Sequence, residues 1–206
     1  IDVVGRVPWG THFCQFYQTR EDLMEILVPY FIAGLENNEL CIWAASSLLS
    51  SRDALEALRK AFPETDRCLD RDQIEIVSST DWYLKLGVFD SGRLLRDWTG
   101  RLDTARRLGF EGLRLAGDTF WVERKDWKRF IEYEKEIDRV IENSRMIALC
   151  TYSLDRCSAA EVVDVVSCHQ FALAKRGGSW EFIENSKRKR VLESLRQNEE
   201  ALDQAC

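Results

Sequence analysis

The sequence predicts an α/β protein with a mainly parallel sheet flanked by helices. Short apolar runs of strand length alternate along the chain with amphipathic stretches of helix length. Two of the runs, LCIWAAS (residues 40–46) and RMIALCTYSL (145–154), are apolar at consecutive positions, as in strands buried on both faces. With 206 residues, of which 45% are apolar and 31% charged, the chain is long enough for one sizeable core.

The first half of the chain provides two helices between three strands. The first strand contains His12 and Cys14, and an amphipathic helix follows and ends near ENNE at residues 36–39. The second strand is the run at 40–46. We expect the next helix within residues 51–63, with Ser50 or Ser51 as its N-cap and Pro63 following its last residue. QIEIVSS (73–79) alternates and is β-branched, which predicts a strand.

The second half repeats this alternation. We expect a helix over about 90–108 that stops at Gly109, a strand that runs into a Gly-Asp loop within residues 110–121, and a helix over 123–143. The apolar stripe of that last helix comprises Trp127, Phe130, Ile131, Glu134, Ile137 and Ile141. The strand at 145–154, a helix over 158–176 and a short strand at 178–184 complete a domain of residues 1–184. Residues 185–206 are polar with spaced leucines and predict a linker helix or the start of a coiled coil.

Charge and cysteine usage narrow the functional classes. The net charge of −6 and the pI near 5.2 argue against a nucleic-acid-binding surface, and the basic run at residues 187–190 is followed by acidic residues. No apolar stretch is long enough to span a membrane, and no signal peptide is visible. Seven scattered cysteines suit reduced thiols in a cytoplasmic protein. Because the chain starts at Ile1, we expect it to be a fragment of a longer protein.

Ligands of open parallel sheets gather at the carboxyl ends of the strands, and those ends are polar here with aromatic neighbours. We therefore expect a small, partly apolar ligand there. The candidate contact residues are His12, Cys14, Tyr17, Trp43, Asp118, Trp121, Cys150 and Tyr152. Loop ends are polar in most proteins, and Asp118 before Thr119 is also typical of a turn residue, so a structural role for it is the preferred reading.

ATP binding and catalysis are both disfavoured. The segment after the first strand, QTREDLME, contains neither glycine nor lysine and carries acidic residues, which is unsuitable for a phosphate. His12 and Cys14 share one strand face and could touch, but nothing nearby resembles an oxyanion hole and no GxSxG motif is present. The sequence does not predict an enzyme.

A metal or haem site is a separate reading. His12 and Cys14 could supply two ligands, and His169 or Cys168 could add a third from the late helix. His169 falls on the inward stripe of that helix, where a lone histidine is most often a core residue. Cofactor binding, ligand contact and plain core packing all remain open for these residues.

Four long blocks resemble the MEDS family, the methanogen/methylotroph DcmR sensory domain. They are HFCQFYQTREDLMEILVPYFIAGLENNELCIW, DWYLKLGVFD, GLRLAGDTFW and MIALCTYSLDRCSAAEVVDVVSCHQFAL, and the resemblance covers about residues 9–184. It implies a fold similar to RecA/KaiC-type ATPases without the P-loop. It also implies sensing of halogenated, methylated one-carbon or other hydrocarbon-like compounds, ahead of a histidine kinase or a transcription regulator. The C-terminal residues are similar to a linker that feeds a PAS or kinase module.

We therefore expect a cytoplasmic, non-catalytic sensory domain that binds a small molecule and signals through its C-terminal helix, as a homodimer with no nucleic-acid or membrane partner. One alternative is a redox, metal or haem sensor that uses His12, Cys14 and His169. A second is a scaffold that binds nothing and only mediates dimerisation.

Overall fold

A mainly parallel sheet organises the computed structural model, which describes residue 5 and residues 7–184. Within that part of the chain the sheet has seven strands in the order β3-β2-β4-β5-β1-β6-β7, and only the β6–β7 pair is antiparallel. The strands are β1 (Thr11–Tyr17), β2 (Leu40–Ala45), β3 (Ile74–Ser78), β4 (Leu113–Asp118), β5 (Met146–Ser153), β6 (Phe171–Arg176) and β7 (Ser179–Glu184). The predicted fold class is confirmed.

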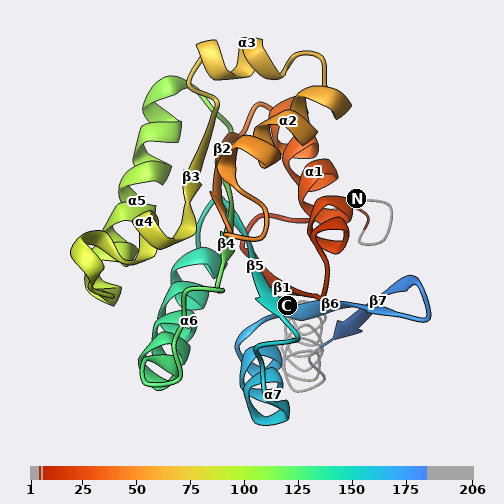
Figure 1. Ribbon diagram of the computed structural model, residues 1–206. Coiled ribbons are helices and arrows are strands. Elements are labelled where there is room, and N and C mark those ends of the chain that lie inside the picture. The colour runs from red at the N-terminus through yellow and green to blue at the C-terminus, as the bar shows by residue number, and fades with distance from the viewer. Residues whose placement is uncertain (1–4, 6, 185–206) are drawn as a thin grey trace, which may run out of the picture.

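Helices cover both faces of the sheet (Figure 1). On one face lie α1 (Arg20–Glu36), α2 (Ser51–Ala61) and α3 (Thr65–Asp70), whose apolar side chains form one core with the strands. On the other lie α4 (Ser79–Tyr83), α5 (Ser91–Leu108), α6 (Trp127–Glu142) and α7 (Ala159–Cys168), which enclose a second core. A 3₁₀ turn, η1 (Lys85–Gly87), connects α4 to α5. We call the two sides the α1 face and the α6 face.

Local capping interactions fix the helix ends. Thr19 and Asp22 form a reciprocal capping box at the start of α1, and Ser50, one of the two predicted N-cap candidates, caps α2. The side chain of Asp90 caps α5, which ends at Gly109 in the left-handed conformation with φ 81°. Glycine adopts this conformation without a steric penalty, which explains why the helix stops there.

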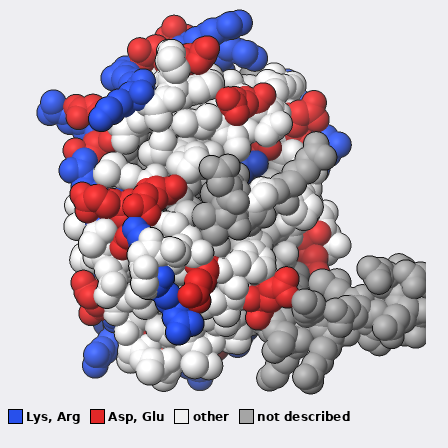
Figure 2. All heavy atoms as spheres, turned by 90° about the vertical axis from the view of Figure 1, so that its right-hand side faces the viewer, with Lys and Arg blue, Asp and Glu red and all other residues white. Residues whose placement is uncertain are grey.

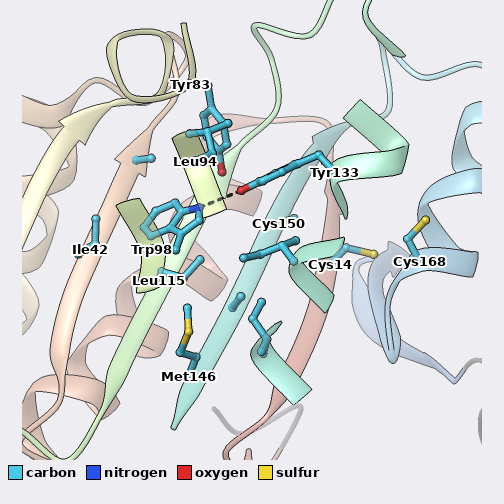
Figure 3. Close-up of a cluster of buried hydrophobic side chains, with 14 of the residues drawn as sticks. Cys14, Ile42, Tyr83, Leu94, Trp98, Leu115, Tyr133, Met146, Cys150 and Cys168 are labelled. Atoms are coloured by element: carbon cyan, nitrogen blue, oxygen red, sulfur yellow. Dashed lines mark hydrogen bonds between the residues drawn. The ribbon is translucent and has the colours of Figure 1, made fainter. Parts of the chain in front are cut away.

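Strand alternation divides the candidate residues between the two faces. His12, Cys14 and Phe16 of β1 point into the α6 face, whereas Phe13 and Tyr17 point into the α1 face. In the parallel pairing of β1 with β5, Cys14 lies opposite Cys150 and His12 opposite Ala148. Figure 3 shows Cys14 and Cys150 projecting from neighbouring strands on the same side of the sheet.

The sequence prediction for residues 158–176 was wrong in its second half. The helix α7 ends at Cys168, His169 is already extended with φ −112° and ψ 155°, and residues 171–176 form β6. The reason is tertiary: Ala172 and Leu173 pair with β1, and the other edge of the same segment pairs with β7. Sheet pairing outweighs the helical spacing that relates His169 and Leu173 to the valines of α7.

Three short elements, α3, α4 and η1, were not predicted from the sequence. The expected linker helix at 185–206 lies outside the described residues. Among the helices that the structure describes, none combines the length and the apolar character needed to cross a membrane.

Acidic and basic side chains are mixed on the surface. On the face shown in Figure 2, the lysines and arginines of the described residues lie among acidic side chains. Many are paired, for example Arg59 with Asp66 at 2.6 Å and Lys175 with Glu25 at 2.7 Å. This arrangement offers no continuous basic surface on the described part of that face.

Candidate functional site

Four side chains with metal-ligating atoms converge in the α6 face. They are His12 from β1, Cys150 from β5, Glu134 from α6 and His169 from the turn after α7, and we call them the His–Cys–Glu cluster. One ligating atom from each lies within 4.8 Å of those from the other three. All four residues are at most 5% exposed. Four segments distant in sequence therefore deliver polar groups to one buried point.

Glu134 is the centre of the cluster. Its Oε2 atom lies 3.1 Å from His169 Nε2 and 3.6 Å from His12 Nε2, and it accepts a 3.1 Å hydrogen bond from the hydroxyl of Tyr152. The Sγ atom of Cys150 is 3.4 Å from His12 Nε2 and 3.9 Å from Glu134 Oε1. The carboxylate is thus held by groups from three other segments.

The outer nitrogen of each imidazole has a partner of its own. Nδ1 of His169 lies 2.7 Å from the carbonyl oxygen of Val165, an acceptor, so Nδ1 carries a hydrogen there. Nδ1 of His12 lies 3.3 Å from a carboxylate oxygen of Asp138. Both Nε2 atoms therefore face the centre of the cluster, and the two rings lie 4.2 Å apart between centroids.

Burial and contacts with one another shift the pKa values of His12, Glu134 and His169. Burial lowers the pKa of His12, and the adjacent His169 lowers it further. Burial also acts to lower the pKa of His169, but contacts with Cys14, Cys150 and Glu134 raise it well above its ordinary value. Burial acts to raise the pKa of Glu134, whereas its hydrogen bond to His169 holds that pKa below the ordinary range. These directions favour a negative Glu134 and a positive His169, whose Oε2 and Nε2 atoms face each other at 3.1 Å.

Cysteine is supplied to the cluster by β5. Cys14 lies beside it, with Sγ 3.9 Å from the carbonyl oxygen of Phe171, and it is not one of the four converging residues. Burial raises the pKa of the Cys150 thiol to about 12. The six cysteines in the described residues are all free thiols.

Three candidates from the sequence, Tyr17, Trp43 and Asp118, lie together on the α1 face instead. The Tyr17 hydroxyl donates a 2.9 Å hydrogen bond to Asp118, which also accepts hydrogen bonds from the Thr151 hydroxyl and from the backbone N–H of Phe120. Burial raises the pKa of Asp118 to about 6. Among the described residues, the crevice that Trp43 and Asp118 line leaves no space for a water molecule. The side chain of Asp118 thus closes a turn with Phe120 and connects β4 to β1 and β5.

Trp121 lies in the aromatic part of the α6 face. Its ring stacks on Tyr83 at 4.9 Å and meets Phe130 edge to face at 5.6 Å between centroids. The structure therefore brings His12, Cys14, Cys150 and Tyr152 together, and it separates them from Tyr17, Trp43 and Asp118.

A cavity of about 290 Å³ opens where β4 and β5 end. Its walls come from the loop after β4, the start of α6, the loop after β5 and the start of α7. They combine apolar and charged side chains, namely Thr119, Phe120, Val122, Arg124, Trp127, Ser153, Asp155, Arg156, Cys157 and Glu161. The guanidinium of Arg156 stacks over the Phe120 ring at 4.3 Å. The site is at the strand ends where the sequence predicts a ligand, but its lining residues differ from the predicted ones.

The turn between β1 and α1 is closed by a carboxylate from the same chain. The Oδ2 atom of Asp22 accepts hydrogen bonds from the backbone N–H groups of Gln18 and Thr19 at 3.1 and 3.0 Å. In a phosphate-binding loop, such N–H groups before a helix contact the phosphate oxygens. In this protein the carboxylate of Asp22 already accepts the hydrogen bonds of these N–H groups.

Sequence reasoning missed Glu134 and Asp138 as site residues. Glu134 stood on the apolar stripe of its helix, and a carboxylate at a buried position of such a stripe needs a partner. A glutamate on an apolar stripe was therefore the sequence signal that could have identified Glu134 as a site residue. Asp138 follows one helical turn later and reaches the same imidazole region.

Three comparisons with known proteins agree with this structure. The transcriptional repressor DcmR of Methylorubrum extorquens (strain DSM 6343 / CIP 106787 / DM4) is 22% identical over 174 residues, which are 80% of this chain and 60% of that protein. The chain thus spans about 60% of the length of this curated relative. A crystal structure of a KaiC-like protein from Pyrococcus horikoshii OT3 superposes with a TM-score of 0.54 at 12% identity, over 86% of this chain and 78% of the other. That likeness establishes a KaiC-like fold.

The sequence model of the MEDS family, the methanogen/methylotroph DcmR sensory domain, matches residues 11–170. This match includes β1 through α7 and all four residues of the His–Cys–Glu cluster. The chain belongs to the MEDS family of sensory domains.

Proposed function

We propose that this domain binds a small, partly apolar molecule in the cavity at the ends of β4 and β5 and reports its presence to an output module. The ligand class we favour is a hydrocarbon-like or one-carbon compound. The observation that carries the proposal is the cavity itself, whose volume of about 290 Å³ suits a small ligand. Phe120, Val122 and Trp127 offer apolar contact, and Arg124 and Arg156 can orient a polar or halogen-bearing end.

A bound molecule can influence the C-terminal segment through α7. The indole N–H of Trp127 on α6, which lines the cavity, donates a 3.1 Å hydrogen bond to Asp164 on α7. The chain then passes through β6 and β7, the last described elements. A ligand that favours one spacing of α6 and α7 would therefore bias the segment that precedes residue 185.

The C-terminal hairpin is also tied to α1. Lys175 of β6 lies 3.1 Å from Asp22 and 2.7 Å from Glu25, and the indole N–H of Trp180 on β7 donates to Glu25 at 2.8 Å. On the same face Phe171 stacks on Phe13 of β1. These contacts support a hairpin that moves together with the sheet core.

The output module we propose is a histidine kinase or a transcription regulator in the same chain, in a cytoplasmic homodimer. The similarity to a transcriptional repressor supports a regulator. We propose no catalysis and no ATP binding for this domain, because Asp22 occupies the backbone N–H groups of the β1–α1 turn.

Thermal unfolding of the 206-residue chain with a panel of small compounds tests the proposal. The panel contains halogenated methanes, methanol, formaldehyde and short alcohols and carboxylates. We expect at least one class to raise Tm, and to change the intrinsic fluorescence through Trp127. Trp127→Ala and Arg156→Ala should abolish the shift, whereas Arg52→Ala, an exposed arginine on α2, should preserve it.

A panel without any shift in the wild-type chain, or an equal shift in the cavity variants, contradicts the proposal. A stable dimer that responds to none of these compounds would favour the scaffold function. Sedimentation of the same samples provides the oligomeric state.

A further inference from the structure

We propose that His12, Glu134, Cys150 and His169 bind one divalent transition-metal ion, with zinc as the metal that suits this set of ligands best. The inference concerns a different site from the cavity at the strand ends and does not depend on a ligand binding there. Two imidazoles, a thiolate and a carboxylate are all established zinc ligands. The sequence alone had suggested His12 and His169 with Cys14, and the structure replaces Cys14 by Cys150 and adds Glu134.

Three of the six separations between ligand atoms in the cluster are close to those of a tetrahedral zinc site, and all six are at most 4.8 Å. Zinc bonds of about 2.0 to 2.3 Å place the ligand atoms of a tetrahedron about 3.3 to 3.8 Å apart. The measured separations are 3.1 Å for His169 Nε2 to Glu134, 3.6 Å for His12 Nε2 to Glu134 and 3.4 Å for His12 Nε2 to Cys150 Sγ.

The imidazoles are already oriented as in metal sites. A metal-bound histidine almost always donates its other ring N–H to a carboxylate or a backbone carbonyl, which fixes the tautomer and the ring plane. His12 has a carboxylate of Asp138 at Nδ1, and His169 has the carbonyl of Val165 there. The hydroxyl of Tyr152 holds the carboxylate of Glu134 in the same way. Both histidines and the glutamate therefore have the outer partners that such ligands require.

A plain core ion pair does not account for this arrangement. Glu134 and His169 alone would satisfy each other, and a buried ion pair is seldom more stable than an apolar replacement. Here a second imidazole and a thiol are added at the same buried point. A cation at the centre satisfies all four groups at once, because each offers it a lone pair or a negative charge after His169 Nε2 and the Cys150 thiol have released their protons to solvent.

His12 and His169 are too close together to be the two axial ligands of one haem iron. Two axial imidazoles stand on opposite sides of the iron with each nitrogen about 2 Å from the metal, which places the ring centres well beyond the 4.2 Å between His12 and His169. A four-ligand site shielded from solvent is instead the structural kind of zinc site. Such an ion would fasten β1, β5, α6 and the α7–β6 turn to one another.

Metal analysis of the 206-residue chain, purified without a histidine tag, is the first test. We expect about one zinc or other transition-metal ion per chain. Removal with a chelator should lower Tm, and titration with Co²⁺ should produce a thiolate-to-cobalt charge-transfer band and intense tetrahedral d–d bands. Chelator competition then gives the affinity.

The variants separate metal binding from stability. Cys150→Ser should remove the charge-transfer band and weaken binding at least tenfold, and Asp138→Asn should weaken binding about tenfold while the band remains. Cys41→Ser is the matched control, since Cys41 is equally buried but lies on the α1 face. It should keep both the band and the affinity.

Absence of stoichiometric metal together with no cobalt spectrum in the folded wild-type chain overturns the inference. An unchanged spectrum in Cys150→Ser, or equal loss in Cys41→Ser, also overturns it. Circular dichroism verifies that each variant is folded. If Cys150→Ser does not fold, Asp138→Asn and Cys41→Ser, assayed under the same conditions, decide the matter. Loss of compound binding in the cavity variants, with metal retained, would leave this inference intact.

Discussion

Arg114 and Glu39 form a bidentate ion pair inside the protein, with Nε and Nη2 of the arginine 2.6 and 3.1 Å from the two carboxylate oxygens. The side chains are only 6% and 4% exposed. The guanidinium also lies 4.7 Å from the ring centre of Tyr30 on α1. The pair thus joins the start of β2 to β4 under α1, on the face opposite the His–Cys–Glu cluster.

Glu39→Gln should lower the free energy of unfolding by about 3 to 5 kcal/mol, because it leaves the arginine charge buried without its partner. Urea denaturation followed by circular dichroism measures the loss. Glu56→Gln serves as control, since it breaks the exposed Arg52–Glu56 pair and should change stability by less than about 0.5 kcal/mol. Equal losses in the two variants would contradict this interpretation.

Two helical glycines should respond to alanine with opposite signs. A Cβ at Gly34 of α1 would lie 2.6 Å from Cδ of Arg114 and 2.8 Å from Sγ of Cys41, whereas a Cβ at Gly100 of α5 meets no atom within 4 Å. Gly100→Ala should stabilise the protein by about 0.5 to 1 kcal/mol through helix propensity. Gly34→Ala should destabilise it by about 1 to 3 kcal/mol through overpacking. Thermal melts compare the two, and a stabilising Gly34→Ala would refute the steric argument.

The free energy of unfolding should fall as the pH rises from about 4 to about 6, because Asp118 loses its proton later in the folded state than in the unfolded state. Burial raises its pKa from 3.8 to about 6 in the folded protein, so between these values the native state keeps a proton that the unfolded state has lost. One pKa unit corresponds to about 1.4 kcal/mol, which gives about 3 kcal/mol over the window. Asp118→Asn removes this titration and can still accept the hydrogen bond from Phe120 N–H.

Relative to the wild type, Asp118→Asn should therefore gain about 3 kcal/mol between pH 4 and pH 7. Denaturation at a series of pH values measures the difference. Asp103→Asn on the exposed surface of α5 is the control. A constant difference between Asp118→Asn and wild type across the range would show that Asp118 does not titrate in this window.

The N-terminus of α7 depends on a capping box. The hydroxyl of Ser158 accepts the N–H of Glu161, and the carboxylate of Glu161 accepts the N–H of Ser158. Ser158→Ala should cost about 1 kcal/mol and increase hydrogen exchange in the first turn of α7. Ser167→Ala, near the end of the same helix, should leave exchange in that first turn unchanged.

The continuous apolar runs and the two-residue alternation of side chains made most of the strands predictable from the sequence. The strands β2 and β5 are continuous apolar runs, and their length and their β-branched or aromatic residues distinguish them from helices. The period of two also placed His12 and Cys14 on one face. Residues 171–176 could not be assigned in the same way, because their strand state comes from pairing with β1 and β7 and not from their own spacing.

The candidate site was only partly predictable for a related reason. Cys150 and Tyr152 follow from the strand, but Glu134 reaches them only through the packing of α6 on β5. Asp118 and Cys150 lie near each other on neighbouring strands, yet they point to opposite faces. Which residues meet depends on strand register and helix placement, and the chain does not display either of these locally.

The carboxylate of Asp22 has a consequence for what the protein can respond to. Because this anion is part of the chain, it accepts the hydrogen bonds of the Gln18 and Thr19 N–H groups as an intramolecular ligand that cannot diffuse away. A free anion would have to displace the Asp22 carboxylate to reach these N–H groups. With its own tethered anion in place, we expect ligand binding at the cavity proposed above to be independent of the concentration of free nucleotides.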